Sequence, residues 1–126
     1  MDAIKIEGTS QTPKVILDKD NNQIEISGHS LPENVQIFYT PILEWIDKYL
    51  EDPNPKTEVI FKMDYYNTAS SKMIFEILKK FDKLHTQGSE TEIHWYYSED
   101  DEDMEEAGED YSSIVEVPFK LISYSV

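Results

Sequence analysis

Near the start of the chain, two short segments suited to β-strands flank a polar turn. Lys14–Leu17 is an apolar run with β-branched side chains, and Gln23–Ser27 alternates hydrophobic and polar residues with a period of two. Between them, Asp18–Asn22 has the composition of a turn. This pattern predicts an antiparallel β-hairpin. Ile4–Glu7 either adds a short edge strand to it or belongs to a loose arm.

A helical pattern follows the hairpin. Ser30 and Glu33 have the spacing of a capping box, so we expect Ser30 to cap the first helix. Apolar residues then recur at helical spacing until Glu51–Pro55 ends the helix. Pro41 lies inside this run, and it either kinks the helix or restarts it with Thr40 as a second cap.

Strands and helices alternate along the rest of the chain. Glu58–Tyr66 has apolar residues on both faces over its first half, which is typical of a central strand covered by helices. The amphipathic helix that follows it ends at Gln87–Ser89. Thr91–Tyr97 alternates again, and Glu116–Ile122 is predicted as the last strand. Pro118 favours an edge position or a strand start there.

The predicted order of elements is β-β-α-β-α-β-α-β. Strands that alternate with helices after an opening hairpin indicate an α/β fold on a mixed sheet. A chain of 126 residues, of which 39% are hydrophobic, fits one domain with a real core. We therefore expect a single domain over residues 1–126.

Composition and charge exclude several functions. The chain has 26 acidic residues against 11 basic ones, all of them Lys, and a net charge of −15. Such a chain repels phosphate backbones and anionic lipids, so we expect neither a nucleic-acid nor a membrane partner. The absence of Cys excludes disulfides and thiolate chemistry. The N-terminus has no signal-peptide pattern, which predicts a cytoplasmic protein.

Three hydroxyl residues, Thr68, Ser70 and Ser71, gather where the central strand meets the second helix. A helix N-terminus offers unpaired N–H groups, and Ser and Thr are preferred there as caps. On these grounds alone the capping role is favoured, with Thr68 as the cap. The alternative is a phosphate acceptor, because a phosphate would add about −1.5 to −2 charge beside donors able to bind it.

An acidic segment runs from Glu99 to Asp110 and holds nine of the 26 acidic residues. We interpret it as the solvated face of a helix with acidic residues in its first turn. A docking surface for a basic partner is the alternative. Metal binding there is less plausible, because the run lacks a His and a fixed ligand spacing.

Catalytic machinery is not evident in the sequence. His29, His85 and His94 lie in different segments, without the spacing of a metal pair or a triad. His94 falls on the opposite strand face from Trp95, and it could be a core residue or a helix-facing one. Asp64 could act as a base with one His in a small hydrolase. We expect no cofactor and no bound metal.

Several segments together resemble one known family, the SiaC-like regulatory phosphoproteins of bacteria, over nearly the whole chain. The segments that carry this resemblance are Gly28–Asn34, Phe38–Tyr39 with Pro41, Tyr66–Lys72, His94–Tyr97, Asp100–Asp110 and Pro118–Phe119. The resemblance implies a fold like the STAS domain of anti-sigma-factor antagonists. This fold agrees with the predicted order of elements.

The resemblance also implies a partner switch. A serine/threonine kinase of the histidine-kinase-like ATPase type would phosphorylate Thr68, and a PP2C-like phosphatase would remove the phosphate. The unphosphorylated form would bind and activate a diguanylate cyclase. STAS relatives use a Ser at the equivalent junction, so Ser70 and Ser71 are minor alternatives, and Asn67, Ser70, Ser71 and Lys72 are the expected partner contacts.

Such a switch needs no catalytic residue, so the chain is expected not to be an enzyme. Two alternatives remain open at this stage. One is a constitutive adaptor that docks a basic partner through its acidic segment, and the other is the small hydrolase built on Asp64.

Overall fold

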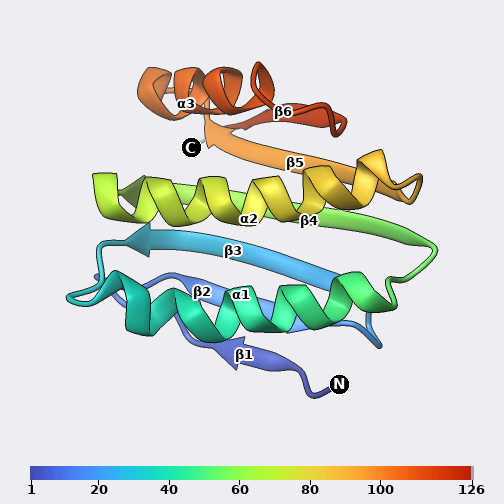
Figure 1. The fold of residues 1–126 in the computed structure, drawn as a ribbon. Helices are drawn as coiled ribbons and strands as arrows, with labels where there is room; N and C mark the ends of the chain where they lie inside the picture. The colour runs from blue at the N-terminus through green and yellow to red at the C-terminus, as the bar shows by residue number, and fades with distance from the viewer. Residues whose placement is uncertain (126) are drawn as a thin grey trace.

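The computed structural model describes residues 1–125, and within them one six-stranded sheet carries three helices (Figure 1). The elements in chain order are β1 (Ile4–Ile6), β2 (Lys14–Asp18), β3 (Gln23–Ser30), α1 (Val35–Glu51), β4 (Lys56–Tyr66), α2 (Thr68–Thr86), β5 (Glu90–Ser98), α3 (Glu102–Ser112) and β6 (Phe119–Tyr124). The single α/β domain is thus as predicted, with one additional strand at the start.

The strands lie side by side in the order of the sequence, from β1 to β6. The pairs β1–β2 and β2–β3 are antiparallel, whereas β3–β4, β4–β5 and β5–β6 are parallel. The sheet is therefore mixed, as predicted. Ile4–Ile6 forms an edge strand on β2 and not a loose arm, and β6 forms the other edge, which agrees with the position of Pro118.

All three helices cover the same face of the sheet (Figure 1). Along β4, Val59, Phe61 and Met63 are buried under them, while Lys62 and Asp64 on the other face are exposed. We call this second face the open face. The expectation of a central strand covered on both faces is therefore wrong.

The start of α1 differs from its prediction. Asn34 caps this helix, because its Oδ1 accepts from the backbone N–H of Ile37 at 3.1 Å. Ser30 instead ends β3 and is buried. The prediction that Pro41 restarts the helix is wrong, because α1 runs through it as one helix, while a kink at Pro41 stays a prediction. The carbonyl that Pro41 leaves unpaired belongs to Ile37, and this residue is exposed to water.

The core lies between the covered face of the sheet and the helices. Aromatic rings fill the part of the core that lies around Trp95 of β5. Trp95 is fully buried, and its ring centroid lies 5.5 Å from those of both Phe61 and Tyr111. The Trp95 Nε1–H donates to the Met104 carbonyl at 3.0 Å, which ties α3 to β5. Among residues 1–125, no helix combines the length and the apolar character needed to cross a membrane.

Candidate functional site

The hydroxyl-rich junction lies where β4 ends and α2 begins. Asn67 is the cap of α2, because its extended backbone places Oδ1 2.9 Å from the backbone N–H of Ser70. Its own N–H donates to the Ser30 carbonyl at 3.1 Å. Thr68 is the first residue of the helix and is exposed. The expectation that Thr68 caps the helix is therefore wrong, since Asn67 already fills this position.

Ser70 faces the interior, where it joins a buried chain of hydroxyl groups. Ser30 Oγ donates to Ser70 Oγ at 2.8 Å and lies 2.6 Å from the hydroxyl of Tyr39. All three residues are fully buried. Burial also raises the pKa of Tyr39, which keeps its hydroxyl neutral. This chain fastens the first turn of α2 to the end of β3 and to α1.

The opposite side of the same turn is held by α3. The Tyr111 hydroxyl donates to the Ser71 carbonyl at 2.9 Å. The Ser71 hydroxyl in turn donates to the Thr68 carbonyl at 2.7 Å. Burial raises the pKa of both Tyr66 and Tyr111, so these neighbouring phenols remain neutral. The start of α2 is therefore anchored from two sides, while the Thr68 side chain faces solvent.

The surface beside the junction combines apolar and acidic groups. Figure 1 shows that α1 and α2 begin at the same end of the sheet. There, Ile37 is 73% exposed in the first turn of α1, and Tyr65 is 51% exposed at the end of β4. Lys72 is also exposed, one turn into α2. A hollow of about 340 Å³ lies at the end of β4 and is lined by Asp64, Tyr65, Tyr66, Asp101, Asp103, Met104 and Ala107.

The acidic segment forms α3, as predicted. Asp101 caps this helix through its carboxylate, which accepts from the Met104 backbone N–H at 2.9 Å. Glu102, Asp103 and Glu105 occupy the first turn, where negative charge is favourable. The exposed acidic face points to solvent, while Met104 and Gly108 are buried.

The residues of the suggested hydrolase do not form a catalytic pair. His29 Nδ1 lies 4.0 Å from Asp64 Oδ2, which is too far for a hydrogen bond between them, and both side chains are about half exposed. Asp64 lines the hollow, whereas His29 is not among the residues that line it. The geometry therefore gives this alternative no support.

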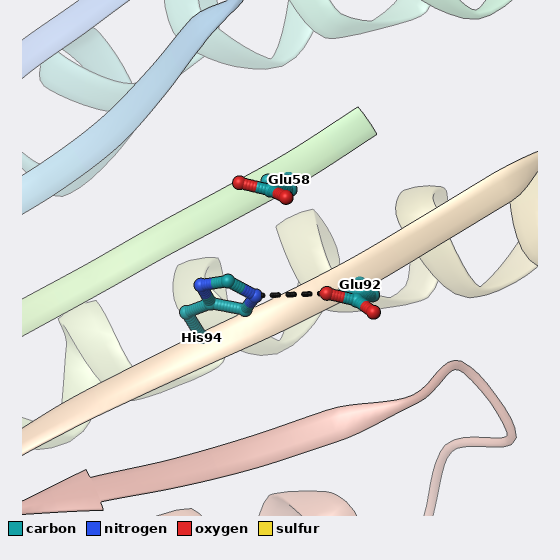
Figure 2. Close-up of side chains that lie close together, drawn as sticks. All are labelled: Glu58, Glu92 and His94. Atoms are coloured by element: carbon teal, nitrogen blue, oxygen red, sulfur yellow. Dashed lines mark hydrogen bonds and ion pairs between the residues drawn. The ribbon is translucent and has the colours of Figure 1, made fainter. Parts of the chain in front are cut away.

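His94 lies on the open face and faces neither the core nor a helix. It joins Glu58 and Glu92 there (Figure 2). The sequence gives only a weak sign of this cluster, because Glu92 and His94 share a strand face at a spacing of two while Glu58 comes from another strand. Only the pairing of β4 with β5 brings the three together.

Comparisons with known proteins agree over nearly the full length of the chain. A model of the SiaC family of regulatory phosphoproteins matches residues 6–124. An uncharacterised protein of Pseudomonas aeruginosa strain UCBPP-PA14 is 26% identical over 121 residues, which cover 96% of each chain.

Solved structures show the same fold. SiaC of Pseudomonas aeruginosa has a TM-score of 0.90 at 25% identity, covering 98% of this chain and 100% of its own. Another match is a crystal structure of the diguanylate cyclase SiaD in complex with its activator SiaC, from the same organism. Its TM-score is 0.91 at 26% identity, covering 96% of this chain and 99% of the matched chain.

Proposed function

Because the chain belongs to the SiaC family of regulatory phosphoproteins, we propose that it is a partner switch controlled by phosphorylation of Thr68. A serine/threonine kinase adds the phosphate, and a PP2C-like phosphatase removes it. The unphosphorylated form binds and activates a diguanylate cyclase, as the complex of SiaD with its activator SiaC suggests. Because the kinase and the cyclase consume ATP and GTP, the switch operates in the cytoplasm.

The observation that carries this proposal is the exposure of Thr68 on an anchored helix start. Among the three hydroxyl residues of the junction, Thr68 is exposed, Ser71 is half-buried and Ser70 is fully buried. A kinase would have to open the helix start to reach Ser70. These facts favour Thr68 as the acceptor over Ser70 and Ser71.

The anchored helix start also supports a mechanism based on charge and bulk. The first turn of α2, residues 68–71, carries no acidic side chain, and the helix dipole favours a phosphate there. The fold therefore tolerates the modification. The outer surface, which holds Tyr65 and the carboxylate of Asp64 nearby, gains about −1.5 to −2 charge. A partner docked on this surface loses both shape and charge complementarity.

The expected partner contacts divide by their exposure. Thr68 and Lys72 present their side chains to solvent and are proposed to touch the partner. Asn67 and Ser70 contribute indirectly, because one caps α2 and the other joins the buried hydroxyl chain. Ser71 is half-buried, so its exposure is intermediate between those of the two groups. No catalytic residue is required, so we propose that the chain has no enzymatic activity of its own.

Mass mapping of the protein purified from its native host tests this proposal. We expect a phosphate on the peptide that contains Thr68, and we expect phosphatase treatment to remove it. Thr68→Ala should abolish the modification, whereas the matched variant Ser71→Ala should keep it. An unmodified mass under several growth conditions, or a phosphate that persists in Thr68→Ala, would contradict the proposal.

A further inference from the structure

A cluster of two carboxylates and one imidazole lies on the open face, formed by Glu58 of β4 and by Glu92 and His94 of β5 (Figure 2). Glu58 and Glu92 are direct partners in the parallel pairing of β4 with β5, and His94 comes two residues after Glu92. Residues two apart in a strand share a face. The register of two neighbouring strands inside the sheet therefore fixes the positions of all three side chains.

The three side chains are close enough to share one ion. His94 Nε2 lies 3.0 Å from Glu92 Oε2, and one ligand atom from each residue lies within 4.8 Å of the others. Four ligands around Zn²⁺ at roughly 2.1 Å lie about 3.4 Å apart in tetrahedral geometry. Small side-chain rotations would therefore bring the three atoms to a common centre. His94 and Glu92 are mostly shielded, with side chains 15% and 21% exposed.

Two lysines balance the charge of this cluster. Glu58 and Glu92 lie directly opposite each other on adjacent strands, and like charges in this arrangement destabilise a sheet. Lys56 Nζ lies 3.3 Å from Glu58 Oε1, and Lys120 Nζ lies 3.4 Å from Glu92 Oε2. These lysine side chains are 45% and 57% exposed, so their ammonium groups can turn into water. A divalent cation would then take over the neutralisation of the two carboxylates.

We propose that Glu58, Glu92 and His94 bind a divalent transition-metal ion of the Zn²⁺ class on the open face. One imidazole nitrogen and two carboxylate oxygens form a donor set that suits Zn²⁺. Hard cations such as Mg²⁺ prefer oxygen ligands only. Three protein ligands leave one coordination position for water, so the ion remains accessible from solvent.

This metal site is separate from the phosphorylation site. From Glu58 to Tyr66 the strand β4 covers roughly 26 Å at about 3.3 Å per residue. The metal site also lies on the open face, whereas α2 covers the other face of the sheet. Loss of the metal ligands should therefore leave phosphorylation of Thr68 unaffected, and each proposal can fail without the other.

Calorimetric titration of the metal-free full chain with ZnCl₂, at physiological ionic strength, tests this inference. We expect saturable binding of one Zn²⁺ per chain, not displaced by excess Mg²⁺. His94→Gln and Glu58→Gln should each weaken the affinity at least about tenfold. His29→Gln is the matched control, because His29 also lies near a carboxylate but outside the cluster, and it should bind as the wild type does.

A further variant separates a defined site from general attraction to an acidic surface. The substitution Lys120→Met removes the ammonium group that competes with a metal ion for the Glu92 carboxylate. This variant, which keeps His94, should bind Zn²⁺ at least as tightly as the wild type. In the double variant Lys120→Met/His94→Gln the affinity should fall again. No saturable binding, equal affinity in wild type and His94→Gln, or displacement by Mg²⁺ would overturn the proposal.

Discussion

Three neighbouring polar residues at the start of α2 have separate roles. Asn67 has an extended backbone, with φ −87° and ψ 175°, and caps the helix. Thr68 is the first helical residue and faces solvent, while Ser70 joins the buried hydroxyl chain through Ser30. The stability of the helix start and its proposed regulation therefore depend on different side chains. The proposed phosphorylation of Thr68 would therefore leave the Asn67 cap in place.

Substitutions at Asn67 and Thr68 should separate these roles. Asn67→Ala removes the acceptor for the Ser70 N–H and should lower the free energy of unfolding by about 1 kcal/mol. Thr68→Ala should change it by less than about 0.5 kcal/mol, because this side chain is exposed. Urea denaturation measures both values. A larger loss in Thr68→Ala than in Asn67→Ala would contradict these roles.

Asp18 controls part of the acid stability of the molecule. Its carboxylate accepts from the Asn21 side chain at 2.7 Å and from the Asn21 backbone N–H at 3.2 Å. These hydrogen bonds, with the help of Lys5, lower the pKa of Asp18 in the folded state. The carboxylate therefore stabilises the fold above its unfolded pKa of about 3.9, and this stabilisation is lost as the pH falls through the lower folded value.

The substitution Asp18→Asn should therefore flatten the acid side of the stability profile. Urea midpoints measured from about pH 7 down to about pH 3 should fall less steeply in this variant than in the wild type. The difference should appear below about pH 5, because that is where Asp18 begins to protonate in the unfolded chain. Parallel profiles for the two proteins would show that Asp18 does not contribute in this way.

At the scale of elements, α3 connects the end of the sheet to the start of α2. The Trp95 indole donates to the Met104 carbonyl, and Tyr111 donates to the Ser71 carbonyl. Gly108 lies against the Trp95 ring, where a larger side chain has no space. Because α3 also contributes to the hollow beside the junction, its position shapes the proposed partner surface.

Gly108→Ala should displace α3. The added Cβ would lie 2.5 Å from Trp95 Cδ1 and from Leu121 Cδ2, which is closer than real Cβ contacts. We expect a net loss of about 1–2 kcal/mol, because overpacking exceeds the gain in helix propensity. Near-UV circular dichroism should also change as the surroundings of Trp95 change. Glu106→Ala, on the exposed side of α3, is the control, and equal stability of the two variants would contradict this view of the packing.

Local patterns predict most elements of this fold. The hairpin, the two long helices and the central strands follow from periodicity and turn composition alone. Pairing across the sheet is less visible, since the three residues of β1 become a strand only through their partners on β2. Ser30 is another residue whose position depends on tertiary contacts that the local pattern does not reveal. Its spacing from Glu33 fits a capping box, but tertiary contacts with Tyr39 and Ser70 place it at the end of β3.

The candidate sites differ in how far the sequence predicts them. The junction at Thr68 is visible as a hydroxyl cluster between a strand and a helix, although the residue that caps the helix is not. Asn, Ser and Thr are all preferred helix caps, so the residue types alone do not select one. The backbone angles decide which residue is the cap. The cluster of Glu58 with Glu92 and His94 is only weakly visible, because the spacing of Glu92 and His94 is local but the approach of Glu58 depends on the register between two strands that are distant in sequence.

At the scale of the whole molecule, the two proposed sites lie on different parts of the surface. The proposed switch lies at the end of the sheet where α1 and α2 begin, and the proposed metal site lies on the open face. The chain has a net charge of −15. A phosphate therefore adds to an existing negative field and changes the charge complementarity with any partner that docks on the unmodified surface.

The most direct measurement compares the unphosphorylated protein with protein stoichiometrically phosphorylated on Thr68 in binding to the diguanylate cyclase and in activating it. We predict that the unphosphorylated form binds and activates, and that the phosphate weakens binding at least about tenfold, or about 1.4 kcal/mol. Phosphatase treatment should restore binding, and Thr68→Ala should bind with or without kinase treatment. Equal binding and activation by the two forms would contradict the proposed switch.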